Sequence, residues 1–300
     1  HENGLPPLFC KWDDSGGNGA ADGCAAWVCK CMCAGKEGKM IPLGMPTLIE
    51  SPAPAECAAL CHALGLSFIE LNMNLPQYQP GSVDVAQCVR LAAEYGIYYT
   101  IHLDENLNAS DFNPYVAEAY KRTALEAIAL AKRLQAPVLN MHLPRGVHFT
   151  LPDKKIYLFE AYRERYLQMI ADFRDACTAA AGDAGITICV ENTDGYLPFQ
   201  RSALKLLLES SVFGLTLDVG HSHSAGKVDE PLILQTPGAL RHMHLHDALG
   251  QTNHLIPGTG EIDLPRYAAL AEQRGCRVVL ETKTCAALRA AVAWMRRLQM

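Results

Sequence analysis

The chain has 300 residues, 49% of them hydrophobic, and a formal net charge of −6 at pH 7. This length fits one large α/β domain or two small ones, with enough apolar residues for a sizeable core. The negative charge offers no general case for binding to nucleic acid or a membrane surface, and no apolar run reaches the roughly 18 residues of a membrane span. Because the N-terminus lacks a charged region followed by an apolar run, we expect no signal peptide and a cytoplasmic protein.

Residues 1–39 differ in composition from the rest of the chain. They hold five of the twelve cysteines, are rich in Gly and Ala, and lack a periodic apolar pattern. The spacing of Cys10, Cys24, Cys29, Cys31 and Cys33 does not give the regular CxxC pairs of a small metal-binding knuckle. We therefore interpret residues 1–39 as a disordered extension, with vector sequence or an over-extended gene start as its alternative origin. The other cysteines occur singly in apolar stretches and are predicted to be buried, reduced thiols.

From residue 41 onward, strand-like apolar runs alternate with helix-like stretches. Gly65 and Gly96 fit helix C-termini, Pro114 fits a helix start, and β-branched and aromatic residues fill the stretch 97–106. Strands are predicted at 41–45, 66–73, 97–106, 137–146, 186–196, 213–221, 240–247 and 277–283. Helices are predicted at 54–65, 83–96, 115–134, 156–182, 201–210, 264–275 and 284–299, with a helix-like stretch at 229–238.

Eight strand–helix units within residues 40–300 predict a single (β/α)8 TIM barrel. Near-continuous apolar strands, each followed by a helix, are typical of a parallel sheet covered by helices, and about 250 residues is the usual size of the closed barrel. The alternative is an open doubly wound sheet, which would place a glycine-rich dinucleotide-binding turn after the first strand. Residues 41–52 contain no such turn.

Acidic residues and histidines recur where the predicted strands end. In a TIM barrel the functional residues lie at the carboxyl ends of the strands, so these side chains would meet at one mouth. Carboxylate oxygen and neutral imidazole nitrogen are ligands for Zn²⁺, Mn²⁺ or Co²⁺. The candidates are Glu70, His102, His142, Glu191, Asp218, His244 and Glu281 at strand ends, with His221 and His254 in the loops after two of these strands.

Charge favours one tight site among these candidates. Glu191, Asp218 and Glu281 would repel one another unless a cation lies between them. Neutral His244 completes a four-ligand set that leaves room for a substrate or water. We therefore predict a divalent metal cofactor, with Mn, Zn, Mg and Co all open. A possible second site comprises His102 and His142 bridged by Glu191, and a less complete third comprises His221 and His254.

Five motifs resemble those of the xylose isomerase-like barrel superfamily, also called AP endonuclease family 2. They are ENT at 191–193, DVGHSHSAG at 218–226, HLHD at 244–247, HLIPGTGEID at 254–263 and LETK at 280–283. The resemblance covers residues 41 to about 298 and implies a TIM barrel. In the epimerase branches of this superfamily, the positions matching Glu191, Asp218, His244 and Glu281 bind one metal. There the two glutamates also act as acid and base on opposite faces of the substrate.

The endonuclease IV branch implies a different use of the histidines. Positions matching His102, His142, His221 and His254 add zinc ligands in that branch. It also has an Asp two residues before the last of these, where this chain has Thr252. A third metal would lack this carboxylate, which weakens the case for trinuclear chemistry.

We expect an isomerase or epimerase of a small sugar, polyol or sugar phosphate, in which one metal polarises a carbonyl while Glu191 and Glu281 move a proton. One alternative is a two-metal phosphoester hydrolase resembling endonuclease IV. Another is an inactive metal-binding barrel, against which the intact ligand set argues. The predicted substrate contacts are Glu70, Arg145, His246, Asp247 and Lys283. Arg145 and Lys283 would hold a phosphate or carboxylate, or are solvated loop charges.

The expected partner is a small molecule. The chain has no basic stretch interleaved with aromatic residues, so a nucleic-acid partner is not expected. The oligomeric state is open, and a homo-oligomer is compatible with the sequence.

Deleting residues 1–39 is expected to leave the thermal stability and metal content unchanged, because the first predicted strand begins only after them. Thermal unfolding and elemental analysis of the full and shortened chains measure both quantities. A large fall in Tm, or the loss of a bound ion, would instead make the cysteine group a real site.

Overall fold

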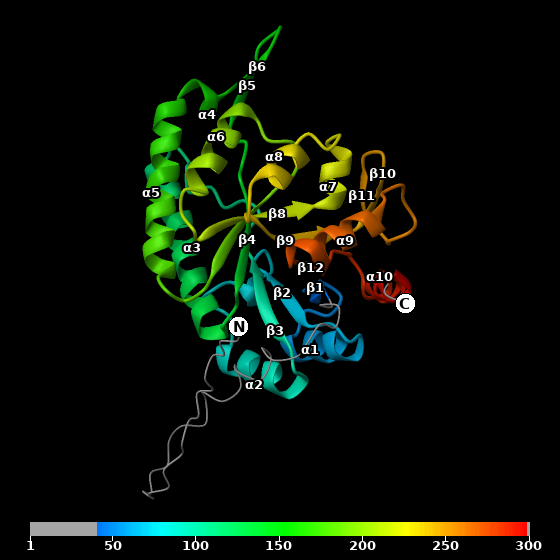
Figure 1. The fold of residues 1–300 in the computed structure, drawn as a ribbon. Helices are drawn as coiled ribbons and strands as arrows, with labels where there is room; N and C mark the ends of the chain where they lie inside the picture. The colour runs from blue at the N-terminus through cyan, green and yellow to red at the C-terminus, as the bar shows by residue number, and fades with distance from the viewer. Residues whose placement is uncertain (1–40, 299–300) are drawn as a thin grey trace, which may run out of the picture. The chain divides into compact units, whose positions relative to one another are not determined.

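The computed structural model describes residues 41–298, so the predicted extension lies outside the described part of the chain. Eight parallel strands form a closed barrel in the order β1-β12-β9-β8-β7-β4-β3-β2 (Figure 1). This confirms the predicted (β/α)8 barrel. The barrel strands are β1 (Leu43–Pro46), β2 (Phe68–Asn72), β3 (Tyr98–His102), β4 (Val138–His142), β7 (Thr187–Glu191), β8 (Phe213–Asp218), β9 (Leu240–Leu245) and β12 (Arg277–Leu280).

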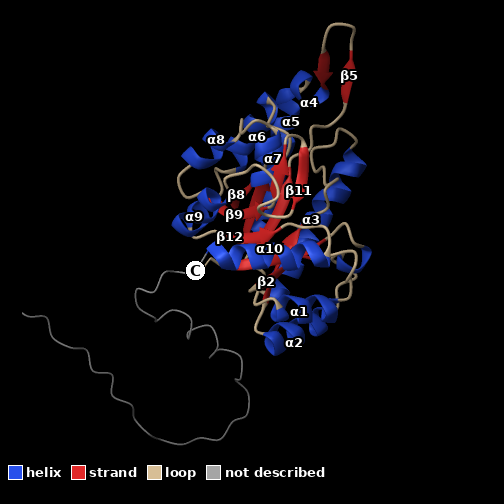
Figure 2. Ribbon diagram, turned by 90° about the vertical axis from the view of Figure 1, so that its right-hand side faces the viewer, coloured by secondary structure: helices blue, strands red, loops and turns tan. Residues whose placement is uncertain are grey.

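Helices cover the outside of the barrel (Figure 2). Several begin at a side chain that accepts an early backbone N–H group, such as Asp84, Asn113 and Asp263. The main helices are α1 (Pro54–Ala63), α2 (Val85–Tyr95), α3 (Pro114–Leu134), α5 (Arg163–Ala181), α6 (Pro198–Leu207), α8 (Glu230–Gln235), α9 (Leu264–Arg274) and α10 (Cys285–Leu298). None of the helices within residues 41–298 is both long and apolar enough to cross a membrane.

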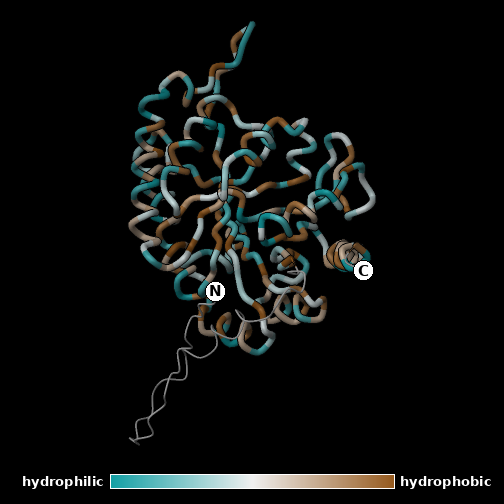
Figure 3. The backbone as a smooth tube through the Cα atoms, in the orientation of Figure 1, coloured by the Kyte–Doolittle hydropathy of each residue, from teal (hydrophilic) through white to brown (hydrophobic). Residues whose placement is uncertain are grey.

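The hydrophobic core lies between the barrel strands and this helical layer. Every residue of β8 is buried, because helices cover its outer face and side chains fill the barrel within. Hydropathy alternates along the helices (Figure 3), which is typical of helices that pack one apolar side against a neighbouring layer. This rigid frame fixes the level at which each strand ends, and so the position of each residue at the mouth.

The predicted helix 156–182 is wrong in its first part. Residues 148–157 form a hairpin of β5 (His148–Thr150) and β6 (Lys155–Tyr157), and a short helix α4 (Leu158–Ala161) follows before α5. Pro152 and Asp153 favour the turn between the two strands. Tyr162 breaks the helix because its φ and ψ of −117° and 45° are not helical. The break lets Phe159 stack on Tyr166, with ring centroids 4.5 Å apart.

Seven of the eight predicted strands also end earlier than expected, and two of these differences shape the mouth. The strand predicted at 213–221 ends at Asp218, whose side chain accepts the N–H of His221 and so starts helix α7 (Val219–Ser224). The strand predicted at 240–247 ends at Leu245. It is followed by a small hairpin of β10 (Asp247–Leu249) and β11 (Thr252–Leu255).

Candidate metal centre

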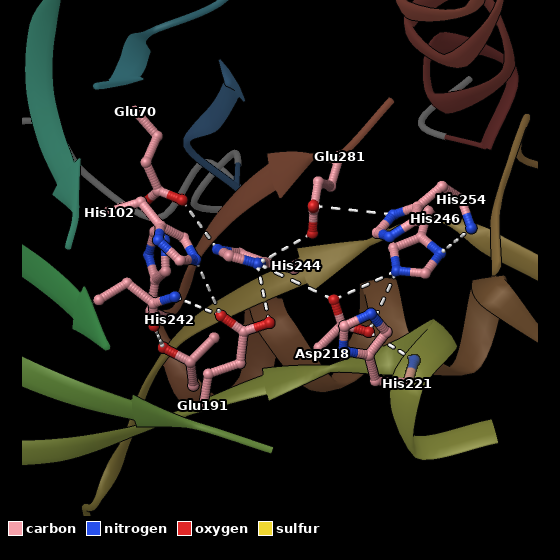
Figure 4. Close-up of polar contacts among 12 residues, drawn as sticks. Glu70, His102, Glu191, Asp218, His221, His242, His244, His246, His254 and Glu281 are labelled. Atoms are coloured by element: carbon pink, nitrogen blue, oxygen red, sulfur yellow. Dashed lines mark hydrogen bonds and ion pairs between the residues drawn. The ribbon is translucent and has the colours of Figure 1, made fainter. Parts of the chain in front are cut away.

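Four strand ends bring one set of ligand-type side chains together at the carboxyl mouth. Glu191 ends β7, Asp218 ends β8, His244 lies in β9 and Glu281 follows β12. Nδ1 of His244 lies 3.1 Å from Oε2 of Glu281, 3.3 Å from Oε1 of Glu191 and 3.9 Å from Oδ2 of Asp218. One ligand atom from each of the four lies within 4.8 Å of all the others (Figure 4). We call these residues the four-ligand cluster. They meet at one place, as the sequence predicts, and their binding of a metal stays a prediction.

The four-ligand cluster favours charged side chains although burial opposes their charged forms. Burial opposes ionisation of Glu191, but the neighbouring imidazoles, that of His244 first, hold its carboxyl pKa well below its usual range. Burial also opposes ionisation of Glu281, and His244 again lowers that pKa. Conversely, burial opposes protonation of His244, but Glu191 and Glu70 raise its pKa well above the ordinary value. The carboxylates therefore draw a positive charge to the centre of the cluster.

A divalent cation fits this set of donors. Nδ1 of His244, the ring nitrogen that faces Glu191, Asp218 and Glu281, is buried and has no aligned hydrogen-bond partner among residues 41–298. Such an unpartnered nitrogen is costly in a protein interior unless a ligand satisfies it. Three carboxylates and one imidazole supply the oxygen and nitrogen donors that Zn²⁺ or Mn²⁺ takes, and the cation would offset the carboxylate repulsion.

His102 and His142 face the other oxygen of Glu191. Their Nε2 atoms lie 3.4 Å and 3.3 Å from Oε2 of Glu191. Nδ1 of His102 lies 2.8 Å from the carbonyl oxygen of Leu103, an arrangement that places a proton on Nδ1 and turns Nε2 toward the carboxylate. Burial opposes protonation of His102, but Glu191 raises its pKa to about 9. A proton or a metal ion fits between the imidazoles and Glu191, so the predicted second group is also brought together.

Three imidazoles form a further group beside Asp218. The ring centroids of His246 and His254 are 4.3 Å apart, and that of His221 lies 5.8 Å and 5.4 Å from them. Nε2 of His246 lies 3.1 Å from Oδ1 of Asp218, and its Nδ1 accepts the N–H of His254 at 2.9 Å. His254 has a left-handed φ of 58°, which is rare for a residue with a Cβ and concentrates at functional sites. Asp218 supplies the carboxylate beside this group, and Thr252 contributes none.

The family is decided by comparison with known proteins. The model of the xylose isomerase-like TIM barrel family matches residues 58–298. The chain belongs to this family. The uncharacterized protein MJ1188 of Methanocaldococcus jannaschii is 24% identical to it over 239 residues, which span 76% of this chain and 83% of that protein.

Solved structures share this family's barrel at low sequence identity. A D-tagatose 3-epimerase-like protein superposes with a TM-score of 0.70 at 20% identity, covering 86% of this chain and 97% of its own. The 3-keto-D-glucoside 4-epimerase YcjR of E. coli gives 0.69 at 15% identity, covering 86% and 100%. D-Psicose 3-epimerase with D-tagatose, from Clostridium cellulolyticum H10, gives 0.64 at 17% identity, covering 86% and 98%. These similarities establish the fold.

Apart from Glu70, a layer of polar side chains inside this xylose isomerase-like barrel is not among the sequence-based predictions. Four polar residues each stand two positions before a ligand-type residue, so both members of each pair point to the same side of the strand. They are Thr100, Asn140, Thr216 and His242, and Glu70 pairs in register with Thr100. We call these five the support layer. Thr216 donates to Oδ1 of Asn140 at 2.6 Å, and Asn140 donates to Oε2 of Glu191. The signal that could have found them is a polar residue at i−2 in an otherwise apolar strand.

The residues predicted to contact the substrate lie in different surroundings. The buried carboxylate of Asp247 accepts backbone N–H groups from residues 248, 258, 260 and 262, and so shapes the loop after β9. Arg145 donates to the carbonyl oxygens of residues 194 and 195 at 2.8 Å and 3.0 Å. Nζ of Lys283 lies 3.0 Å from Oε1 of Glu281 at the mouth. As substrate contacts, these three residues, His246 and Glu70 stay predictions.

Gly220→Ala is expected to destabilise the protein by about 1–3 kcal/mol, the usual cost of forcing extra carbon into a filled space. A Cβ at Gly220 would overlap the ring of His246, which Asp218 and the backbone of His254 hold in place. Urea unfolding measures the change. Gly81→Ala is the matched control, because a Cβ there meets nothing within 4 Å. Equal stability of the two variants would show that the His246 ring can move aside freely.

Proposed function

We propose that this protein is a divalent-metal-dependent isomerase or epimerase that acts on a small sugar, polyol or sugar phosphate. The observation that carries the proposal is that the carboxylates of Glu191 and Glu281 both approach one buried nitrogen of His244. Their oxygens lie 3.3 Å and 3.1 Å from the same nitrogen of His244. They come from β7 and from the end of β12, which β8 and β9 separate in the barrel. Two acid–base groups thus flank one candidate metal position.

The chemistry that this arrangement supports is proton transfer next to a carbonyl group. Glu191, Asp218, His244 and Glu281 would hold the cation, which supplies polarisation of a substrate carbonyl and an adjacent hydroxyl. One glutamate takes the proton from the carbon beside the carbonyl as the C–H bond breaks. The other gives a proton to the opposite face of that carbon, which inverts its configuration. The lowered carboxyl pKa of Glu191 and Glu281 in the metal-free protein favours the ionised form that the proton-accepting glutamate needs, whereas the donating glutamate has to carry a proton when it reacts.

The names of the similar structures point to the same chemistry. They include a D-tagatose 3-epimerase-like protein, a D-psicose 3-epimerase with D-tagatose and an L-ribulose 3-epimerase. Ketoses of this size are therefore the first substrates to test. Lys283, which is 60% exposed beside Glu281, is placed to meet a phosphate or hydroxyl at the mouth, and we include its substrate contact in the proposal.

Hydrogen–deuterium exchange tests the proposal directly. The chain is incubated in D₂O with D-tagatose, D-psicose, L-ribulose and their phosphates, with Mn²⁺ or with EDTA, and the sugars are examined by NMR. We expect deuterium at the carbon beside the carbonyl and formation of the epimer, both only with the metal. Absence of exchange with every sugar at full metal occupancy would contradict the proposal.

A second candidate function is two-metal phosphoester hydrolysis. The observation that favours it is the group of His102, His142 and Glu191, whose ligand atoms lie within 4.8 Å of one another beside the four-ligand cluster. A metal pair about 3.5–4 Å apart, bridged by one carboxylate, is the usual arrangement for this chemistry. Hydrolysis of bis(p-nitrophenyl) phosphate with Zn²⁺ is the corresponding assay.

A further inference from the structure

Glu70 contacts His244 at Nε2, the ring nitrogen that faces away from the three carboxylates of the four-ligand cluster. Oε1 of Glu70 lies 2.9 Å from Nε2 of His244, whereas Nδ1 of the same ring faces Glu191, Asp218 and Glu281 (Figure 4). The imidazole therefore lies between a single carboxylate on one side and the three carboxylates of the four-ligand cluster on the other.

Glu70 is itself held firmly. Its Oε2 accepts hydrogen bonds from Oγ1 of Thr100 at 2.9 Å and from Nε2 of His242 at 2.8 Å, and only 2% of the residue is exposed. Strand β2, which carries Glu70, is not a neighbour of β9 in the barrel. The side chain therefore crosses the barrel interior to reach the two histidines of β9. A carboxylate with both oxygens engaged in the interior is poorly placed to bind a substrate at the mouth.

We propose that Glu70 is a positioning residue of the metal centre. With its Oε1 2.9 Å from Nε2 of His244, the carboxylate favours a proton on that nitrogen and so sets the tautomer and orientation of the ring, with the lone pair of Nδ1 toward the cation. Histidines that bind a metal commonly donate their other N–H to a carboxylate in this way, and loss of that partner weakens metal binding about 10–100-fold. This inference rests on the metal dependence in the proposed function. It replaces a substrate contact by a role in holding a ligand.

The test is the affinity for Mn²⁺ alone, measured by titration calorimetry on the metal-free full-length chain. In Glu70→Gln, a carboxamide can donate to Nε2 of His244 and would then favour the tautomer with its proton on Nδ1. We expect the dissociation constant for Mn²⁺ to rise about 10–100-fold. Thr100→Val removes one hydrogen bond that holds Glu70 and should raise the constant by less than about 10-fold, with little change in shape.

Glu230→Gln is the matched control. Glu230 is a buried glutamate too, but its side chain accepts from Ser222 at 2.9 Å and from Tyr267, outside the four-ligand cluster. Unchanged Mn²⁺ affinity in Glu230→Gln, with weakened affinity in Glu70→Gln and Thr100→Val, supports the positioning role. Wild-type affinity in Glu70→Gln overturns it. Equal weakening in the control also overturns it, because the effect would then be a general one of altering a buried carboxylate.

The outcome for the proposed function is read separately. Deuterium exchange into sugars by the unaltered chain decides the epimerase proposal, and Mn²⁺ affinity of the variants decides the role of Glu70. If the unaltered chain binds Mn²⁺ but exchanges no sugar proton, while Glu70→Gln binds Mn²⁺ more weakly, the positioning role stands and the epimerase proposal fails.

Discussion

Asp218→Asn is expected to abolish activity and release the metal while leaving the barrel folded. Asp218 is fully buried at the end of β8, where its Oδ1 accepts the N–H of His221 at 2.6 Å and starts α7. Asparagine caps helices about as well as aspartate, so α7 should persist. The backbone N–H and C=O of residue 218 remain paired with the side chain of Asn192. The substitution thus removes one anionic metal donor and weakens the contact with Nε2 of His246, while the backbone contacts at the end of β8 remain. Because loss of a partner outside the first coordination shell already costs about 10–100-fold, loss of a ligand should lower activity by more than about 100-fold.

Elemental analysis after dialysis gives the metal content of this variant, deuterium exchange into sugars gives its activity, and circular dichroism gives its fold. Asp229→Asn is the matched control, because Asp229 is a buried aspartate whose oxygens accept from the backbone N–H of Tyr196 and from Arg201. This control should keep its metal. Full metal occupancy and turnover in Asp218→Asn would exclude Asp218 as a ligand.

The barrel and the convergence of the ligand-type side chains at its mouth depend on local features of the sequence. The barrel strands are short stretches rich in apolar residues, and some follow a recognisable helix end, such as Gly96 before β3 and Gly275 before β12, each with a left-handed φ. Because parallel strands of a barrel all end at one mouth, residues after the runs must meet there. Strand register then sets which side chains are neighbours: β8 and β9 pair Asp218 with His244, so these two lie at the same level.

Other features depend on contacts that no short stretch of sequence contains. The depth of Glu70 is set by its register with Thr100, which puts Asn72 and not Glu70 level with His102. A residue expected at the end of a strand can thus lie two residues deeper in the barrel than the mouth. Only the pairing of the strands reveals this. The position of the His246 ring likewise depends on Gly220, from another strand–helix unit. The hairpin at 148–157 was not predicted because each of its strands has only three residues, mostly exposed, which is too short for a strand to be told from other structure by its hydrophobic pattern.

The double variant His102→Ala, His142→Ala is expected to keep the metal of the four-ligand cluster and to lose activity mainly through poorer placement of the substrate. None of the four ligands is altered, and His244 still faces Glu281 and Asp218 through Nδ1. The two imidazoles contact Glu191 only through Oε2, so Oε1 remains available to the same cation. If the reaction is epimerisation, elemental analysis should find one equivalent of metal before and after the change. A control that removes two exposed imidazoles elsewhere, His62→Ala with His148→Ala, should alter neither metal content nor turnover.

Phosphoester hydrolysis predicts a different result for the same double variant. Glu191 alone cannot hold a second ion once both imidazoles are gone, so the unaltered chain would carry at least two equivalents and the variant would lose one. We favour the first result because of position 252, beside the group of His221, His246 and His254. A multi-zinc hydrolase of the endonuclease IV type would require a carboxylate at this position, and this chain has Thr252. The net charge of −6 also gives no electrostatic attraction for a nucleic-acid substrate. Loss of a full metal equivalent, together with cleavage of bis(p-nitrophenyl) phosphate by the unaltered chain and no exchange with any sugar, would establish hydrolysis in place of epimerisation.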